Sequence, residues 1–177
     1  MRTPSISLLL LAALLCASGC TVLSVKADGV AARGARWLLL PVMNQGEPGP
    51  AGERVEELLR TVLQADKGIE VSHYGPSLPP RGEVAVEGDE RARYERALAW
   101  GRDQGFRYGI GGSVQEWRYR TASDGEAAVG LSLRVVDLQS ARTIFSASGA
   151  RSGWGRDTLA GTAQALLRTM LESLKTR

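Results

Sequence analysis

A cysteine near the start of the chain stands where a lipid-modified residue would stand. Three small residues, Ala-Ser-Gly, precede Cys20, and before them come Arg2 and an apolar run over residues 6–15. The run is shorter than the about 20 residues that a membrane-spanning helix needs, so it is typical of a signal peptide. A thiol at such a cut site can take a diacylglycerol, and cleavage frees the amine of the same residue for acylation. The pattern predicts cleavage before Cys20 and lipid on that cysteine.

The segment before the cysteine resembles a bacterial lipobox, with Ala17 in place of the more usual leucine. The alternative is a buried or disulfide-bonded Cys20. The only other cysteine is Cys16, which would leave with the signal peptide, so the mature chain would hold no disulfide. Thr21 follows in place of the aspartate that retains lipoproteins in the inner membrane of enteric bacteria. We therefore expect the outer membrane, with the protein anchored in its inner leaflet and facing the periplasm.

Trp154 lies between Gly153 and Gly155 in a polar loop, outside any periodic pattern of apolar residues. An exposed tryptophan on a loop is typical of a binding surface or of a membrane interface. The alternative is that Trp154 folds back over the start of the last helix. For a lipid-anchored chain we favour a membrane-interface role.

Two carboxylates lie together at an expected loop tip and are candidates for a functional role. Asp124 and Glu126 flank Gly125 at an expected turn, close to the basic Arg118 and Arg120. An ordinary solvated turn explains these carboxylates equally well.

The sequence offers little for catalysis. Its single histidine, His73, lies in a short expected strand, where a packing or surface role is the simpler interpretation. One histidine without a free cysteine is too few for the usual zinc site. The run from Gly109 to Gly112 lacks the strand-loop-helix setting of a phosphate loop and indicates a bulge or a close neighbour. We predict no enzyme activity, no cofactor and no metal site.

The charge balance argues against nucleic acid as a partner. The chain has 22 Lys and Arg residues against 19 Asp and Glu residues, for a net charge of +3. No basic run with interleaved aromatic residues is present in the sequence.

Hydrophobic patterns predict the elements that must position these residues. Three segments have helical periodicity: Val55 to Leu63, Tyr94 to Gly101 and Leu159 to Leu174. Gly68 and Gly105 are expected to end the first two helices, and Asp89 and Asp157 to cap the second and third. Five segments have strand patterns: Trp37 to Met43, Ile69 to Tyr74, Arg107 to Tyr119, Glu126 to Asp137 and Thr143 to Gly149. Pro41 places the first strand near an edge or at a bulge.

The predicted order is therefore β-α-β-α-β-β-β-α. It indicates a single α/β (α+β) domain with a mostly antiparallel sheet and about three flanking helices. We expect residues 1–19 to be a lipoprotein signal peptide, residues 20–36 a lipidated tether and residues 37–177 the periplasmic domain.

Three motifs in the second half of the chain are familiar: E-W-R-Y from Glu116, D-G-E-A-A-V-G from Asp124 and S-A-S-G-A-R-S-G-W-G-R from Ser146. Between about Gly111 and Leu171, the sequence resembles the PelC family of outer-membrane lipoproteins, which serve export of the biofilm exopolysaccharide Pel. The first half of the chain matches that family only by pattern.

The resemblance implies a fold related to CsgG and the TolB N-terminal domain, and a large ring under the outer membrane. It implies that one face of the ring is aromatic and meets lipid, with Trp154 among its residues. It implies that the opposite face and the aperture are acidic, with Asp124 and Glu126 as candidates.

The partners that the resemblance implies are further copies of the chain, the cationic polysaccharide, a PelB-like outer-membrane β-barrel exporter and the bilayer. An alternative function stays open, which is a monomeric lipoprotein of CsgG/TolB-like fold that activates a periplasmic partner such as a peptidoglycan synthase. The oligomeric mass of the purified protein distinguishes a ring-forming export lipoprotein from a monomeric activator.

Overall fold

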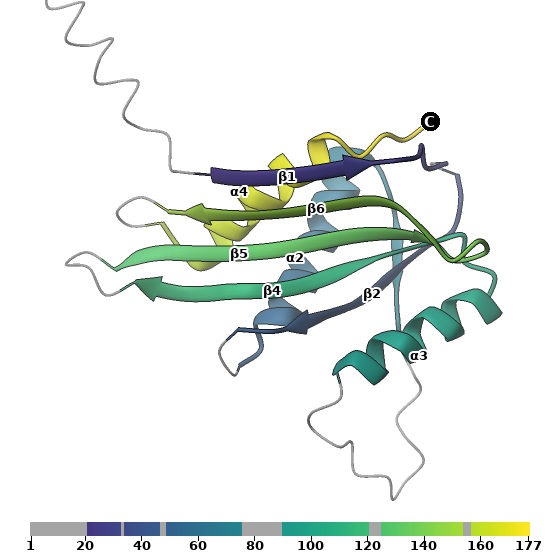
Figure 1. Cartoon of the computed structure of the whole chain (residues 1–177), viewed down its shortest axis with the longest axis horizontal. Helices are drawn as coiled ribbons and strands as arrows, with labels where there is room; N and C mark the ends of the chain where they lie inside the picture. The colour runs from purple at the N-terminus through teal and green to yellow at the C-terminus, as the bar shows by residue number, and fades with distance from the viewer. Residues whose placement is uncertain (1–20, 33, 47–48, 76–89, 121–124, 154–156) are drawn as a thin grey trace, which may run out of the picture.

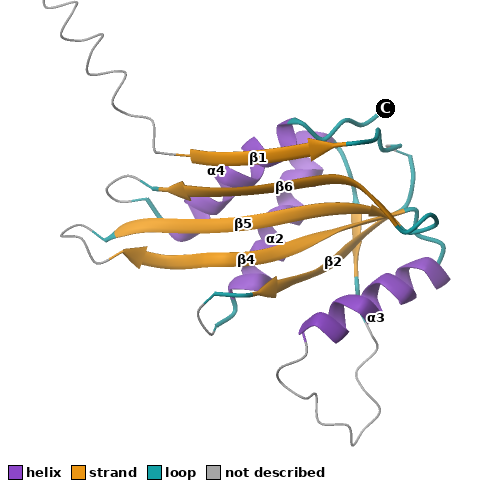
Figure 2. Cartoon of the chain, viewed as in Figure 1, coloured by secondary structure: helices purple, strands orange, loops and turns teal. Residues whose placement is uncertain are grey.

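One six-stranded sheet and three helices make up the described part of the chain (Figures 1 and 2). The computed structural model describes residues 21–32, 34–46, 49–75, 90–120, 125–153 and 157–177. The strands are β1 (Thr21–Ala27), β2 (Trp37–Asn44), β3 (Val71–His73), β4 (Tyr108–Arg120), β5 (Glu126–Asp137) and β6 (Arg142–Ser152). The helices are α2 (Ala51–Lys67), α3 (Glu90–Asp103) and α4 (Leu159–Glu172). The predicted single α+β domain with three helices is confirmed.

The sheet is mixed, with the strand order β1-β6-β5-β4-β2-β3. β4, β5 and β6 form an antiparallel meander, and β1 pairs antiparallel with β6. β2 runs parallel to both β3 and β4, because α2 and α3 each carry the chain back across the sheet between these strands. Antiparallel pairing therefore dominates, as predicted.

The first strand differs from the sequence-based expectation. Thr21–Ala27 was expected within the tether, yet it forms β1 and pairs with β6 over its whole length. β1 covers what would otherwise be the open edge of β6, and Val25 packs against the larger hydrophobic cluster. Further along, Ala31 is fully buried and bridges Thr176 near the C-terminus. The domain therefore includes residues that lie well before Trp37.

The helices cover the two faces of the sheet unequally. The apolar stripes of α2 and α4 pack on one face and form the larger hydrophobic cluster with residues such as Leu59, Leu131 and Leu166. α3 packs on the other face, over β2, where Tyr94 and Ala97 meet Leu38. On that second face, α3 lies only at one corner, and no helix of the described chain covers β1, β6 and β5 (Figure 1).

The glycines of β4 permit close packing, as their position inside a strand predicts. A side chain at Gly111 would meet Leu40 of β2, and one at Gly112 would meet the backbone oxygen of Ser132. Pro41 was expected near an edge or at a bulge, and the register between β2 and β4 shifts between Leu39 and Val42, on either side of it.

The helix ends agree with prediction in part. Gly68 ends α2 in the left-handed conformation at φ 63°, and Gly105, at φ 73°, follows α3. The predicted cap at Asp157 is wrong, because Thr158 caps α4 by accepting a hydrogen bond from the Gly161 N–H. Asp89 lies outside the described residues.

Candidate functional site

Three of the four predicted site residues lie outside the described part of the chain. These are Cys20, Asp124 and Trp154, while Glu126 is described. The residues that flank the three are placed, and they gather at one end of the sheet. We call this end, where β1 and β5 begin and β4 and β6 finish, the Thr21 end (Figure 1).

Thr21 is the first residue of β1 and follows Cys20 directly in sequence. It is the register partner of Arg151 in β6, whose guanidinium donates a 3.0 Å hydrogen bond to the Thr21 hydroxyl. The predicted lipidation site is therefore a single peptide bond from the sheet.

The loop that contains Trp154 starts from the same end. Gly153, which precedes it, donates its N–H to the carbonyl oxygen of Ala127 at 2.7 Å. Thr158, shortly after the loop, caps α4. The structure thus brings the chain neighbours of Cys20 and of Trp154, which are far apart in sequence, to one end of the sheet.

The last residues of β4 place a charged cluster at the Thr21 end. Arg118 and Arg120 both donate to Glu116, at 3.0 Å and 3.3 Å. Burial acts to raise the pKa of Glu116, but the hydrogen bonds and charges of the two arginines outweigh it and hold the pKa below its ordinary value. The carboxylate of Glu116 therefore stays ionised at neutral pH.

Glu126 lies beside this cluster. It is the first residue of β5 and the register partner of Arg120. Opposite charges directly across an antiparallel pair attract each other. The predicted acidic candidate thus stands at the Thr21 end, next to arginines.

An apolar groove lies on the helix-covered side of the same strand end. Trp117 and Tyr119 of β4, Leu58 of α2 and Leu159 of α4 line a groove of about 620 Å³. Tyr119 is 50% exposed, and its hydroxyl accepts a 3.4 Å hydrogen bond from the Leu159 N–H. β4 therefore ends with aromatic side chains on one face and guanidinium groups on the other.

A second, larger groove crosses the sheet face that α2 and α4 leave open. Its volume is about 960 Å³, and small residues of β5 and β6 such as Gly130 and Ser148 form its floor. Val22, which is 74% exposed, lies at one side, and Glu116 and Arg118 lie at the other.

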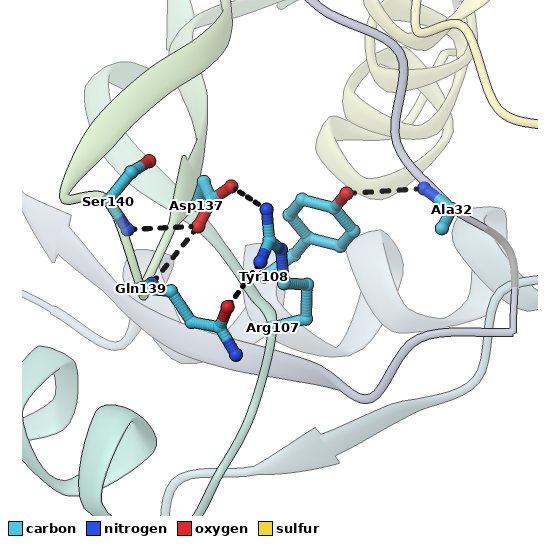
Figure 3. Close-up of polar contacts among 6 residues, drawn as sticks. All are labelled: Ala32, Arg107, Tyr108, Asp137, Gln139 and Ser140. Carbon is cyan, nitrogen blue, oxygen red and sulfur yellow. Dashed lines mark hydrogen bonds and ion pairs between the residues drawn. The ribbon is translucent and has the colours of Figure 1, made fainter.

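The opposite end of the sheet, which we call the Asp137 end, contains a polar network (Figure 3). Asp137 accepts hydrogen bonds from the backbone of Gln139 and Ser140, and forms an ion pair with Arg107 at 2.5 Å. Tyr108 beside Arg107 accepts a hydrogen bond from Ala32. These contacts hold the β5–β6 turn to the start of β4, so the network explains local structure.

The other polar candidates have structural explanations. His73 lies 3.7 Å from Glu57 of α2, with both side chains substantially exposed. Trp100 is partly buried and packs against Tyr74 and Phe106 at the margin of the smaller hydrophobic cluster. In the described residues, no group of three or more His, Cys, Asp and Glu side chains could hold a metal ion.

Within the part of the chain that the structure describes, no helix has both the length and the apolar composition of a membrane span.

Comparison with known proteins first concerns the fold. No family model and no curated protein matches the chain. Among solved structures, lipoprotein GNA1162 from Neisseria meningitidis matches with a TM-score of 0.51 at 15% identity, over 80% of this chain and 99% of that one. At this identity the match shows the fold alone.

A more specific match is to PelC from Paraburkholderia phytofirmans, which forms a dodecamer. One PelC structure matches with a TM-score of 0.72 at 28% identity, covering 89% of this chain and 99% of PelC. A single-residue variant of the same protein matches with a TM-score of 0.73 at 28% identity, covering 89% of this chain and 100% of that one. The chain therefore has the PelC fold, and the resemblance stated from its sequence motifs is confirmed.

Proposed function

We propose that this chain is a non-enzymatic outer-membrane lipoprotein that assembles into a ring and guides a cationic exopolysaccharide of the Pel type to its exporter. The observation that carries the proposal is the match to the PelC dodecamer over 89% of the chain at 28% identity. A ring multiplies weak contacts between its surface and a repeating polymer, which suits guidance without trapping.

The anchor in this proposal is lipid on Cys20. Its support is the sequence pattern before Cys20 and the position of Thr21 as the first residue of the sheet. With no spacer between them, lipid on Cys20 would hold the Thr21 end against the bilayer. Trp154 would contribute an aromatic side chain to the same membrane contact, because the loop that contains it leaves β6 at this end.

The polymer-guiding role of Asp124 and Glu126 rests on the sequence motif that contains them. Glu126 lies at the Thr21 end and opposite Arg120, whereas the resemblance implies an acidic surface away from the membrane. Replacement of both, Asp124→Asn with Glu126→Gln, tests the role. Reduced polymer export with an unchanged melting temperature would support the guiding role of the two carboxylates. Unchanged export would contradict this role.

The oligomeric mass of the purified mature protein tests the assembly. We expect light scattering to give the mass of a closed ring, whereas a monomer at high concentration would favour the alternative of a monomeric activator lipoprotein.

Deletion of the gene should abolish polymer export, and the wild-type chain supplied in trans should restore it. A Cys20→Ala chain should fail to restore it, because the anchor is absent.

A further inference from the structure

We propose that lipid transfer to Cys20 and hydrolysis of the bond before it take place before β1 joins the sheet. The substrate of both reactions is then a chain whose β1 lies outside the sheet, and docking of β1 onto β6 follows maturation. The inference rests on the proposed anchoring at Cys20 and adds to it an order of events. Its support is the position of Thr21 in the sheet and the few contacts that hold β1 there.

Both reactions need access to Cys20 and to the residues that follow it. In lipid transfer, the Cys20 sulfur forms a bond to the glyceryl carbon of a glycerophospholipid, and the phosphate headgroup leaves with the thiol proton. In hydrolysis, water adds across the peptide bond, which gives a carboxyl group on Gly19 and an amine on Cys20. Extended peptides are commonly recognised through main-chain hydrogen bonds along the segment. The residues from Thr21 onward must therefore be free to enter the enzyme.

The bond to be cut lies close to the membrane. The apolar run of the expected signal peptide ends at residue 15, and Cys20 follows five residues later. Five residues span at most about 18 Å when fully extended. The enzymes must therefore reach Cys20 at the bilayer surface.

Thr21 does not lie at the tip of the sheet. The strand registers align Thr21 with Arg151 of β6, Arg151 with Val129 of β5, and Val129 with Trp117 of β4. β4 continues for three further residues, 118–120, paired with the first residues of β5. At about 3.3 Å per residue, β4 extends about 10 Å beyond the row of Thr21. An enzyme at the membrane surface would meet the ends of β4 and β5 first, so a sheet that already includes β1 shields the bond.

β1 can leave the sheet without opening the core. None of its seven residues is buried, and five are exposed. Val25 is only partly buried against the larger hydrophobic cluster, and the Thr21 side chain is held by one hydrogen bond from Arg151. The core residues of β6, Phe145 and Ala147, belong to a cluster that α4 and β5 also build. An edge strand with so few buried contacts opens at a lower free energy than the core.

The fixed part of the chain begins at Ala31. This residue is fully buried, its N–H donates to the Lys175 carbonyl oxygen at 3.0 Å, and its carbonyl oxygen accepts from the Arg177 N–H at 3.1 Å. Ala31 follows Cys20 by eleven residues, which span about 36–40 Å when extended. With β1 outside the sheet, this segment leaves room for an enzyme between the bilayer and the folded remainder. Docking of β1 then draws the Thr21 end to the bilayer.

A disulfide that holds β1 on β6 in the uncleaved precursor tests the proposal. Ser24→Cys with Ser148→Cys joins two register partners, in a chain that also carries Cys16→Ser. The full-length precursor is purified in detergent from cells without the lipid-transferring enzyme, oxidised, and incubated with membranes that contain both enzymes. Peptide mapping confirms the disulfide and a free Cys20, and mass spectrometry follows lipid gain and signal-peptide loss. We expect no product from the oxidised precursor and complete processing of the same precursor after reduction.

The matched control is Ser113→Cys with Ser132→Cys, again with Cys16→Ser. These two residues are register partners in β4 and β5, and their hydroxyl oxygens lie 2.8 Å apart. The control disulfide leaves β1 free, so its oxidised precursor should be processed as the reduced one is. Melting curves of both oxidised precursors show whether each domain is folded.

A second variant of the β1-locked chain has a flexible Gly/Ser spacer of about ten residues between Cys20 and Thr21. The spacer should restore processing while β1 stays in the sheet. Processing of the β1-locked chain without a spacer at the rate of the control would overturn the proposal, and so would a failure of the spacer to restore it.

The proposed anchor fails in a different way from the proposed order of events. If reduced and control precursors also gain no lipid at Cys20, the anchor is wrong, and the order of events falls with it. If locked and reduced precursors are processed equally, the anchor stands and only the order of events is wrong.

Discussion

The two ends of the sheet differ in how their polar groups are satisfied. At the Asp137 end, Asp137 accepts two backbone hydrogen bonds and pairs with Arg107, so its carboxylate is used within the chain (Figure 3). At the Thr21 end, Arg118 and Arg120 share one carboxylate and remain about half-exposed. Hydrogen bonds made by a nearly buried group stabilise a fold, whereas exposed ion pairs contribute about 0–1 kcal/mol each.

The difference indicates a division of roles along the strands. The Asp137 end holds the turn between β5 and β6 and the start of β4 in place. The Thr21 end leaves the side chains of Arg118, Arg120 and Tyr119 about half-exposed to solvent. Variants at the two ends should therefore separate loss of stability from loss of function.

The largest loss of stability is expected from Asp137→Ala. The substitution leaves the backbone N–H groups of Gln139 and Ser140 without their acceptor and Arg107 without its ion pair. We expect a loss of about 2–3 kcal/mol in the free energy of unfolding, measured by urea denaturation. Asp137→Asn retains one acceptor oxygen and should lose less. If both variants unfold at the wild-type midpoint, the network does not stabilise this end.

Glu56 of α2 makes a contact with β2 where the register between β2 and β4 shifts. Its carboxylate accepts a 2.9 Å hydrogen bond from the Val42 N–H. Burial raises the pKa of Glu56 above its ordinary value, although this hydrogen bond and the charge of Arg93 act in the opposite direction. Glu56→Leu removes the acceptor and should cost about 1–3 kcal/mol.

Glu56→Gln serves as the control, because its amide oxygen can still accept the Val42 N–H. Because its pKa is raised, Glu56 binds a proton more tightly in the folded state than in the unfolded state. The contribution of Glu56 to the stability of the wild-type protein therefore rises as the pH falls through its folded-state pKa. We therefore expect Glu56→Gln to be at least as stable as wild type at neutral pH, with the advantage shrinking in acid. A glutamine variant as unstable as the leucine variant would contradict this account of the bulge.

A smaller effect is expected at the Thr21 end from Arg118→Gln with Arg120→Gln. Because the pKa of Glu116 is lowered, the stability it contributes is present above the ordinary glutamate pKa and is lost as pH falls through the folded-state value. The double variant should lack this loss in acid and differ from wild type by less than about 1 kcal/mol at neutral pH. Melting temperatures measured over a range of pH values give both the loss of stability in acid and the difference at neutral pH. A large loss of stability in the double variant at neutral pH would mean that the cluster stabilises the fold.

The smallest effect on stability is expected from Trp154→Ala. If Trp154 meets lipid, its removal should reduce membrane seating or polymer export and leave the melting temperature unchanged. Trp100→Ala is the matched comparison, because Trp100 packs against Tyr74 and Phe106 and its loss should destabilise the fold. Unchanged export in Trp154→Ala would count against the interface role.

Much of the fold could be predicted from local patterns. The apolar stripe of α2 and the alternating apolar residues of β5 each predict one buried face. The structure buries that face of α2 and that face of β5. β1 was missed because an edge strand is stabilised by its partner β6, which lies more than 100 residues later, rather than by a strong pattern of its own. The cap at Thr158 was missed because Asp157 and Thr158 are both good capping residues and only the backbone conformation selects between them.

The candidate site was predicted less completely. Sequence motifs predict roles for Cys20 and Trp154, but only the strand registers show that the chain segments next to them meet at one end. Glu116, Arg118 and Arg120 lie on one face of β4 because side chains alternate along a strand, so the spacing of these three residues could have predicted their ion pairs.

Electron cryomicroscopy of the full-length, membrane-extracted protein in lipid nanodiscs tests the central claim most directly. The account predicts a closed ring whose Thr21 end, with the ends of β4 and β6, lies against the bilayer, and whose β5–β6 turns point away from it. A monomer, or a ring whose β5–β6 turns meet the lipid, would contradict it.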